Sequence, residues 1–119
     1  MRRGEVWWAD LGAYRPREQT GRRPGVIWQS DTLSRVLQSV LVIPLTTNLA
    51  RARLAGTAVI ATTAEGPPEE SVALAFQLRA IPRSALRTKI RDLTEDELAE
   101  LELATDEALG RVEPEEANR

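Results

Sequence analysis

The sequence contains no cysteine and no histidine among its 119 residues. The absence of cysteine excludes disulfides and thiolate nucleophiles, and the absence of histidine excludes any mechanism that carries a proton on imidazole. Zinc sites built on Cys or His side chains are excluded for the same reason. Catalysis by this chain, if it has any, must therefore use carboxylates, hydroxyls, arginines or backbone groups, and we expect no cofactor.

Long apolar runs are also scarce. The longest, around Val40–Leu45, is far shorter than the roughly 20 residues of a membrane-spanning helix. The start, Met1–Glu5 (MRRGE), does not lead into the apolar core of a signal peptide. These patterns predict a cytoplasmic protein. The length indicates one compact domain, which we place at residues 1–112, and residues 113–119 are expected to form a disordered acidic tail.

Lysine occurs once, at Lys89, whereas 15 of the 16 basic residues are arginines. Residues 1–91 carry 14 Lys and Arg against 7 Asp and Glu, and residues 92–119 carry 2 against 11. This asymmetry fits a body that binds a polyanion through arginine forks, with an acidic appendage held away from the binding face. It fits equally a codon bias toward arginine combined with a solvated acidic helix.

Short apolar segments, punctuated by Gly and Pro, predict a mainly β protein. Their spacing favours a curled antiparallel sheet or a small barrel rather than alternating strands and helices. The polar segment 13–22 is long enough to be a functional loop. The predicted strands are Gly4–Leu11, Arg23–Gln29, Val36–Leu45, Thr57–Thr62, Ser71–Leu78 with a continuation at Ala80–Ile81, and Thr88–Arg91.

The sequence predicts one long helix, over Glu95–Leu109, with capping signals at both ends. Thr94 and Glu97 have the spacing of a capping box, and Leu93 and Leu98 have the spacing of a hydrophobic staple. Gly110 ends the helix. An apolar stripe predicts that the helix packs on the sheet, so that its carboxylates are structural; the stripe comprises Leu98, Leu101, Ala104, Ala108 and Leu109.

Arg22 and Arg23 stand where the long loop enters the second predicted strand, directly before Pro24. Proline fixes its own φ and restricts the residue before it to extended geometry. The stiff backbone can hold Arg23 ready for a phosphate. The alternative is a loop salt bridge from Glu18 to Arg22 or Arg23.

Two further segments place polar side chains at strand ends. Pro44–Asn48 (PLTTN) presents hydroxyl and amide groups that suit a phosphate, although such residues also cap turns for local reasons. Alternation along Phe76–Ile81 puts Gln77 and Arg79 on one face of a strand, which is also the ordinary pattern of a wet sheet face. The three tryptophans, Trp7, Trp8 and Trp28, are interpreted as core or interface residues rather than base-stacking platforms.

Taken together, these motifs resemble the MazF/PemK (Kid) family of toxin endoribonucleases. The resemblance rests on GEVWWADL, EQTGRRPGVI, IPLTTN and FQLRAI, followed by a capped helix, and it covers roughly residues 2–110. It implies an SH3-like barrel of the CcdB/MazF type that works as a homodimer. It also implies metal-independent cleavage of single-stranded RNA at short sequence motifs, and inhibition by a cognate, MazE-like antitoxin with an acidic C-terminal segment.

The resemblance assigns roles to individual residues. Arg23 and Thr46 correspond to the catalytic pair, and Glu18 is a candidate general base. The RNA-binding candidates are Gln19, Arg22, Thr47, Asn48, Gln77 and Arg79. The chain departs from the family in two ways, because many members have an acidic residue where this chain has Phe76, and some use a histidine in the first loop.

RNA supplies its own nucleophile, the ribose 2′-hydroxyl, so an enzyme of this kind only aligns the attack and neutralises the phosphorane. The expected products carry a 2′,3′-cyclic phosphate and a 5′-hydroxyl. Two rivals remain open at the level of sequence. The same barrel hosts gyrase poisons of the CcdB type, and it could also serve as a noncatalytic RNA- or protein-binding module.

Overall fold

The computed structural model describes residues 1–12, 20–52, 54–61 and 69–113. Within these residues the chain forms seven strands, two α-helices and three single 3₁₀ turns. In chain order they are β1 (Glu5–Asp10), β2 (Arg22–Ile27), α1 (Asp31–Ser34), β3 (Ser39–Thr46), η1 (Leu49–Arg51), β4 (Thr57–Ile60), β5 (Ser71–Leu74), η2 (Ala75–Gln77), β6 (Arg79–Pro82), η3 (Arg83–Ala85), β7 (Leu86–Asp92) and α2 (Glu95–Ala108).

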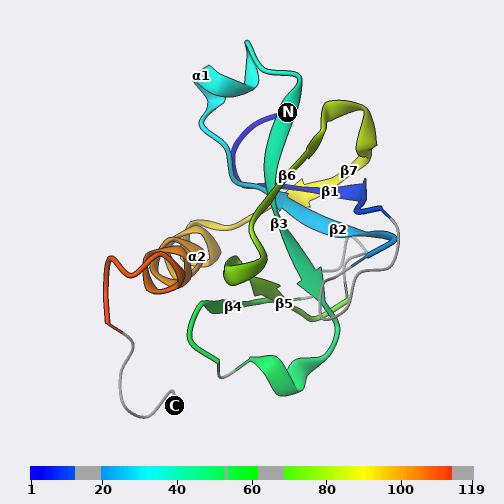
Figure 1. Cartoon of the computed structure of the whole chain (residues 1–119). Coiled ribbons are helices and arrows are strands. Elements are labelled where there is room, and N and C mark those ends of the chain that lie inside the picture. The colour runs from blue at the N-terminus through cyan, green and yellow to red at the C-terminus, as the bar shows by residue number, and fades with distance from the viewer. Residues whose placement is uncertain (13–19, 53, 62–68, 114–119) are drawn as a thin grey trace.

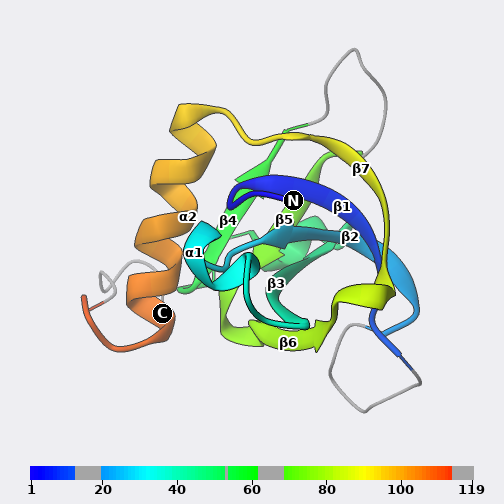
Figure 2. The ribbon, with the colours of Figure 1, turned by 90° about the horizontal axis from the view of Figure 1, so that it is seen from above.

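The strands form one curled sheet in which every recorded pairing is antiparallel. Its order is β4-β5-β3-β2-β1-β7, and β6 pairs with β3 beside that path. Figure 1 shows β3 running through the middle of the molecule, and Figure 2 shows the sheet curling round with α2 against one side. The predicted fold class, a curled antiparallel sheet with a C-terminal helix, is confirmed.

Alternate residues of β3 serve two buried clusters on opposite faces of the sheet, as the two-residue period of a strand requires. Ile43 and Leu45 belong to the cluster that α2 covers, which also includes Leu101 and Ala104. Val40 and Val42 belong to a second cluster with Ala9, Leu11, Ile27 and Ile81. Because β3 is buried on both faces, both sets of alternating residues must be apolar. This explains the near-continuous apolar run seen in the sequence.

The predicted helix and its end signals are confirmed. The Thr94 hydroxyl accepts from the Glu97 N–H, and the Glu97 carboxylate accepts from the Thr94 N–H, which completes the capping box. Leu93 is buried and Leu98 packs on the same cluster. The expected apolar stripe is shorter than predicted, because Ala108 and Leu109 are exposed beyond the point where the helix leaves the sheet.

The prediction of one strand over Ser71–Leu78 is wrong. β5 ends at Leu74, and η2 takes up Ala75–Gln77 before β6 begins at Arg79. β5 pairs Ala73 with Leu45, and this register continued along β3 would bring Phe76 opposite Val42. Instead Arg79 lies opposite Val42, so the turn absorbs three residues while the chain keeps to the same edge of β3.

The strand predicted from Val36 begins only at Ser39, because Val36 belongs to the turn that follows α1. The short helix α1 is capped by Ser30, whose hydroxyl accepts from the Leu33 N–H. After β3 the chain forms η1. Most of the loop at 13–22 and most of the acidic tail lie outside the described residues. None of the helices that the structure describes has the length and apolar character needed to cross a membrane.

Candidate functional site

Arg23 lies near the start of β2, opposite Ala9 of β1. Its side chain is half-buried, and its Nε donates a hydrogen bond of 2.8 Å to the Thr20 carbonyl. The following Pro24 stiffens the backbone at this point. Arg23 is therefore fixed in two ways: Pro24 restricts its backbone, and the hydrogen bond to Thr20 orients its guanidinium.

Thr46 is the last residue of β3. The recorded β2–β3 pairs end at Gly25 opposite Pro44, and Thr46 pairs instead with Val72 of β5. Thr46 is only 6% exposed, and its Oγ1 accepts a 3.2 Å hydrogen bond from the Asn48 N–H. A hydroxyl that accepts in this way still has its own proton to donate.

A pocket of about 420 Å³ opens beside these strand ends, and we call it the Trp8 pocket. It brings Arg23 together with Thr47, whereas Thr46 is not among the lining residues. The lining residues are Trp8, Arg23, Pro24, Leu45, Thr47, Glu69 and Ser71. The pocket therefore combines an apolar wall with a guanidinium, two hydroxyls and one carboxylate.

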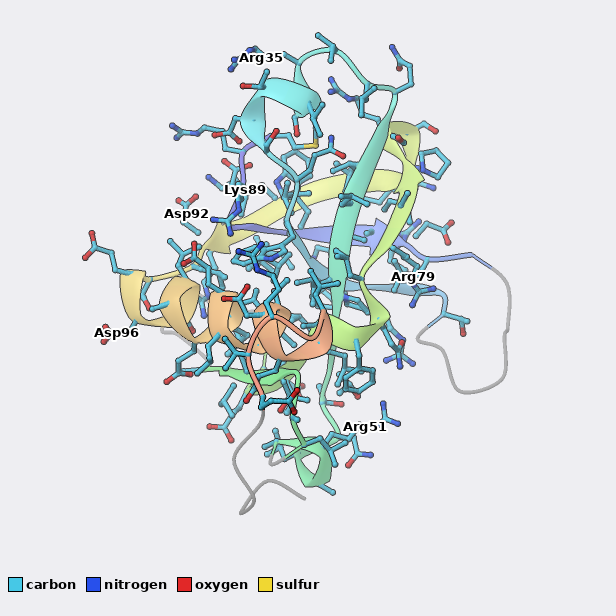
Figure 3. All side chains as sticks on the ribbon, turned by 60° about the vertical axis from the view of Figure 1, so that its left-hand side comes forward. Arg35, Arg51, Arg79, Lys89, Asp92 and Asp96 are labelled. Carbon is cyan, nitrogen blue, oxygen red and sulfur yellow. The ribbon has the colours of Figure 1, made fainter. Side chains whose placement is uncertain are left out.

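A second pocket, of about 490 Å³, contains Gln77 and Arg79, and we call it the β6 pocket. It lies between the end of β1, at Asp10–Gly12, and the segment Phe76–Pro82. Gln77 comes from a 3₁₀ turn and Arg79 from a strand, so the predicted alternation along one strand is wrong even though the two residues share a pocket. Figure 3 shows Arg79 projecting away from α2.

A third and smaller pocket, of about 230 Å³, adjoins Trp8, and we call it the Arg87 pocket. Trp8, Arg22, Arg87 and Thr88 line it. Arg87 lies 3.7 Å from the Asp10 carboxylate, and Asp10 is also the cross-strand partner of Arg22. Trp8 thus borders both this basic pocket and the Trp8 pocket.

The other predicted site residues fall into three groups. Asn48 accepts from the Ala50 N–H and caps η1, which is the local role that the sequence left open for it. Arg22 and Thr47 are exposed at strand ends, as an RNA-binding role requires. Glu18 and Gln19 lie outside the described residues, and so does any salt bridge that Glu18 makes.

The most perturbed acid in the described part of the chain is Glu5, which the sequence analysis did not single out. Burial by itself would raise the pKa of Glu5, but hydrogen bonds from the Trp7 Nε1–H, the Arg2 N–H and Lys89 outweigh it and lower the pKa to about 2. Asp92 and Glu5 in turn raise the pKa of Lys89. This group ties β1 to β7 and is structural.

Sequence reasoning missed Trp8, Glu69, Ser71 and Arg87 as pocket residues. Trp8 could have been found from its spacing to Asp10. Residues two positions apart in a strand share a sheet face, and the charge of Asp10 indicates that this end of the face meets solvent. Trp28 is buried as expected, and Arg3 stacks on its ring at 3.9 Å. Trp7 and Trp8 are only half-buried, so core packing does not account for them fully.

A curled antiparallel sheet whose strand ends carry arginines and hydroxyls around pockets, with a helix against one side, defines a small, mainly β protein suited to an anionic ligand. The family model of the PemK-like, MazF-like toxins of type II toxin–antitoxin systems matches residues 2–109. The chain belongs to this family.

Individual relatives agree with this membership. The endoribonuclease MazF of Staphylococcus saprophyticus subsp. saprophyticus is 33% identical over 110 residues, which cover 92% of each chain, and MazF of Staphylococcus epidermidis matches equally well. MazF of Deinococcus radiodurans has a similar structure, with a TM-score of 0.78 and 22% identity over 92% of this chain and 96% of its own. A mycobacterial endoribonuclease, solved in complex with its cognate antitoxin, has a TM-score of 0.78 and 21% identity, covering 96% of this chain and 99% of its own.

Proposed function

We propose that this toxin is a sequence-specific endoribonuclease that cuts single-stranded mRNA and thereby blocks translation. The matches to MazF endoribonucleases over 92% of the chain carry this conclusion. The arginine-rich strand ends support it, because a cleaved RNA strand presents one phosphate per nucleotide to the protein.

In the proposed reaction the ribose 2′-oxygen attacks the adjacent phosphorus and the bond to the 5′-oxygen breaks. The products are a 2′,3′-cyclic phosphate and a 5′-hydroxyl, and no metal takes part. Arg23 neutralises the nonbridging oxygens of the phosphorane with the planar fork of donors on its guanidinium. Glu18 is the candidate base that takes the proton of the 2′-hydroxyl, and the departing 5′-oxygen takes up a proton from solvent water.

The position of Arg23 supports its assignment, since its side chain is tied to the Thr20 carbonyl before substrate arrives. Thr46 is proposed as the second donor to the phosphate, and its hydroxyl, which accepts from the Asn48 N–H, keeps its own proton for that contact. Thr47 is the more exposed hydroxyl and shares the Trp8 pocket with Arg23, so it belongs to the same binding surface.

Sequence choice must come from other residues, because phosphate contacts carry no base information. Gln77 and Arg79 in the β6 pocket can reach base edges, and Gln19, Arg22 and Asn48 complete the set of proposed RNA-binding residues. The chain acts as a cytoplasmic homodimer. A MazE-like antitoxin with an acidic C-terminal segment blocks the RNA path by imitating its charge.

The test is to incubate a long single-stranded RNA with the purified protein in EDTA and to map the ends. We expect discrete cuts that leave 2′,3′-cyclic phosphates, and no cleavage where the nucleotide at the cut carries 2′-deoxyribose. Cleavage that requires added metal, or that persists at a 2′-deoxy position, contradicts the mechanism. Intact RNA combined with stalled gyrase would identify a CcdB-like poison instead.

A further inference from the structure

Trp8 occupies a position that the proposed function does not yet explain. It lies in the middle of the sheet face on β1, opposite Pro24 of β2, and remains half-buried instead of joining either core cluster. A large indole left partly open to solvent, with pockets on two sides, is available to a ligand. The two pockets differ in chemistry.

On one side, the Trp8 pocket has a flat apolar wall made by Trp8, Pro24 and Leu45, and its about 420 Å³ is large enough for a nucleobase. Its lining also includes the exposed Thr47 hydroxyl and the Glu69 carboxylate, which can meet a base edge, whereas the Ser71 hydroxyl is buried and donates to the Glu69 carbonyl. A carboxylate accepts from base amino groups, as in contacts to cytosine N4.

On the other side, the Arg87 pocket is smaller and basic. Arg22 and Arg87 line it together with the Thr88 hydroxyl, a donor set that fits one phosphate group. Asp10 balances these charges, since it lies opposite Arg22 in the β1–β2 register and 3.7 Å from Arg87. The Asp10 side chain also accepts from the Gly12 N–H, which keeps the carboxylate in place.

We propose that Trp8 is a base-stacking platform for single-stranded RNA, with one nucleobase lying in the Trp8 pocket and the neighbouring phosphate held by Arg22 and Arg87. This inference rests on the proposed RNA substrate and adds a nucleotide subsite to it. The strand then crosses β7, β1 and β2 and reaches Arg23 at the rim of the same pocket. Stacking is tolerant of sequence, so Trp8 contributes affinity, and Glu69 contributes the preference among bases.

The test measures binding of a short mixed-sequence 2′-O-methyl RNA, which keeps bases and phosphates but cannot cut itself. Trp8→Leu is expected to weaken binding by about 5- to 150-fold, the usual range for loss of one stacked base. Trp8→Phe keeps an aromatic face and restores most of the affinity. Equal binding by Trp8→Leu and the unchanged protein overturns the platform, and so does a Phe variant as weak as the Leu variant.

The phosphate half of the subsite is tested with inorganic polyphosphate, which has charges but no bases. Arg87→Gln weakens binding of both polyphosphate and RNA and lowers the log–log salt slope for RNA by about 0.7. Trp8→Leu leaves polyphosphate binding unchanged. Arg35→Gln is the matched control, because Arg35 is an exposed arginine beside α1 (Figure 3). An Arg87→Gln effect no larger than that of Arg35→Gln overturns the phosphate contact.

Binding and cleavage fail separately in this design. A protein that binds 2′-O-methyl RNA through Trp8 but leaves unmodified RNA intact retains the platform and loses the proposed nuclease function. A protein that cuts RNA at the same rate and with the same KM after Trp8→Leu retains the nuclease and loses the platform. If the protein has both the stacking platform and the nuclease activity, Trp8→Leu raises KM more than it lowers kcat, because stacking contributes to RNA binding rather than to the chemical step.

Discussion

At the scale of single residues, Arg23 gains its position from two neighbours. Pro24 limits the backbone before it, and the Thr20 carbonyl accepts from its Nε. The sequence could predict the first of these, because the effect of proline is local. Strand alternation also predicts that Trp7 and Trp8 face opposite sides, but it could not predict that Trp7 packs against the cluster around Ala9 while Trp8 faces the pockets.

Arg23→Ala removes the proposed phosphate donor and should lower kcat by about 10²–10³-fold, the usual loss for one preorganised donor. The thermal unfolding midpoint should change little, because Arg23 belongs to neither core cluster. Arg23→Lys keeps the positive charge but loses the planar fork of donors, so its kcat should lie between those of Arg23→Ala and the unchanged protein. Single-turnover cleavage of a radiolabelled RNA measures the rates, and an Arg23→Ala enzyme as fast as the unchanged one contradicts the role.

At the scale of elements, α2 is joined to the sheet by a buried ion pair. Arg91 of β7 donates two hydrogen bonds of 2.8 Å to the Glu97 carboxylate, and a third from Arg91 reaches the Ala61 carbonyl after β4. Burial by itself raises the pKa of Glu97, but Arg91 and the backbone N–H groups of Thr94 and Ala61 outweigh it and lower the pKa. One carboxylate therefore caps the helix and fixes its angle to the sheet.

Glu97→Gln leaves the Arg91 guanidinium buried without its anion and should lower the free energy of unfolding by about 3–5 kcal/mol. Glu102→Gln is the matched control on the same helix, because its contact with Arg3 is exposed and should be worth at most about 1 kcal/mol. Urea denaturation of the three proteins measures the difference. Equal losses from both substitutions would show that the buried pair has no special weight.

The elements also show where sequence patterns stop being informative. Capping and staple signals for α2 act within a few residues, and all of them are confirmed. The break between β5 and β6 depends instead on which residues of β3 each strand meets, and that register involves partners 26 to 43 residues away in sequence. The predicted strand was wrong, but Gln77 and Arg79 still lie together, because both line the β6 pocket.

At the scale of the whole molecule, Asp96 of α2 and Arg79 of the β6 pocket lie on opposite sides (Figure 3). This arrangement fits one of the two interpretations of the contrast between residues 1–91 and 92–119, in which an acidic appendage is held away from a basic binding face. The separation of these two charges supports the polyanion-binding interpretation of the charge pattern.

The stability of the whole fold should depend on acid through Glu5. Its pKa is lowered from 4.5 to about 2, so its stabilising effect is complete above pH 4.5 and is lost as the pH falls toward 2. The full shift corresponds to about 3 kcal/mol. Glu5→Gln should thus be less stable than the unchanged protein at pH 7, and the difference should shrink below pH 4. Urea midpoints across this range measure it, and a constant difference contradicts the linkage.

The pairing of β1 with β7 has a consequence for how the toxin is made. The strand synthesised first pairs with the last strand of the sheet, so the β1–β7 ladder cannot form on a nascent chain that is still short of Asp92. The Arg87 pocket depends on that ladder, because it takes residues from both strands and from β2. Most of the polypeptide must therefore be synthesised before this pocket, and the phosphate contact proposed for it, can form.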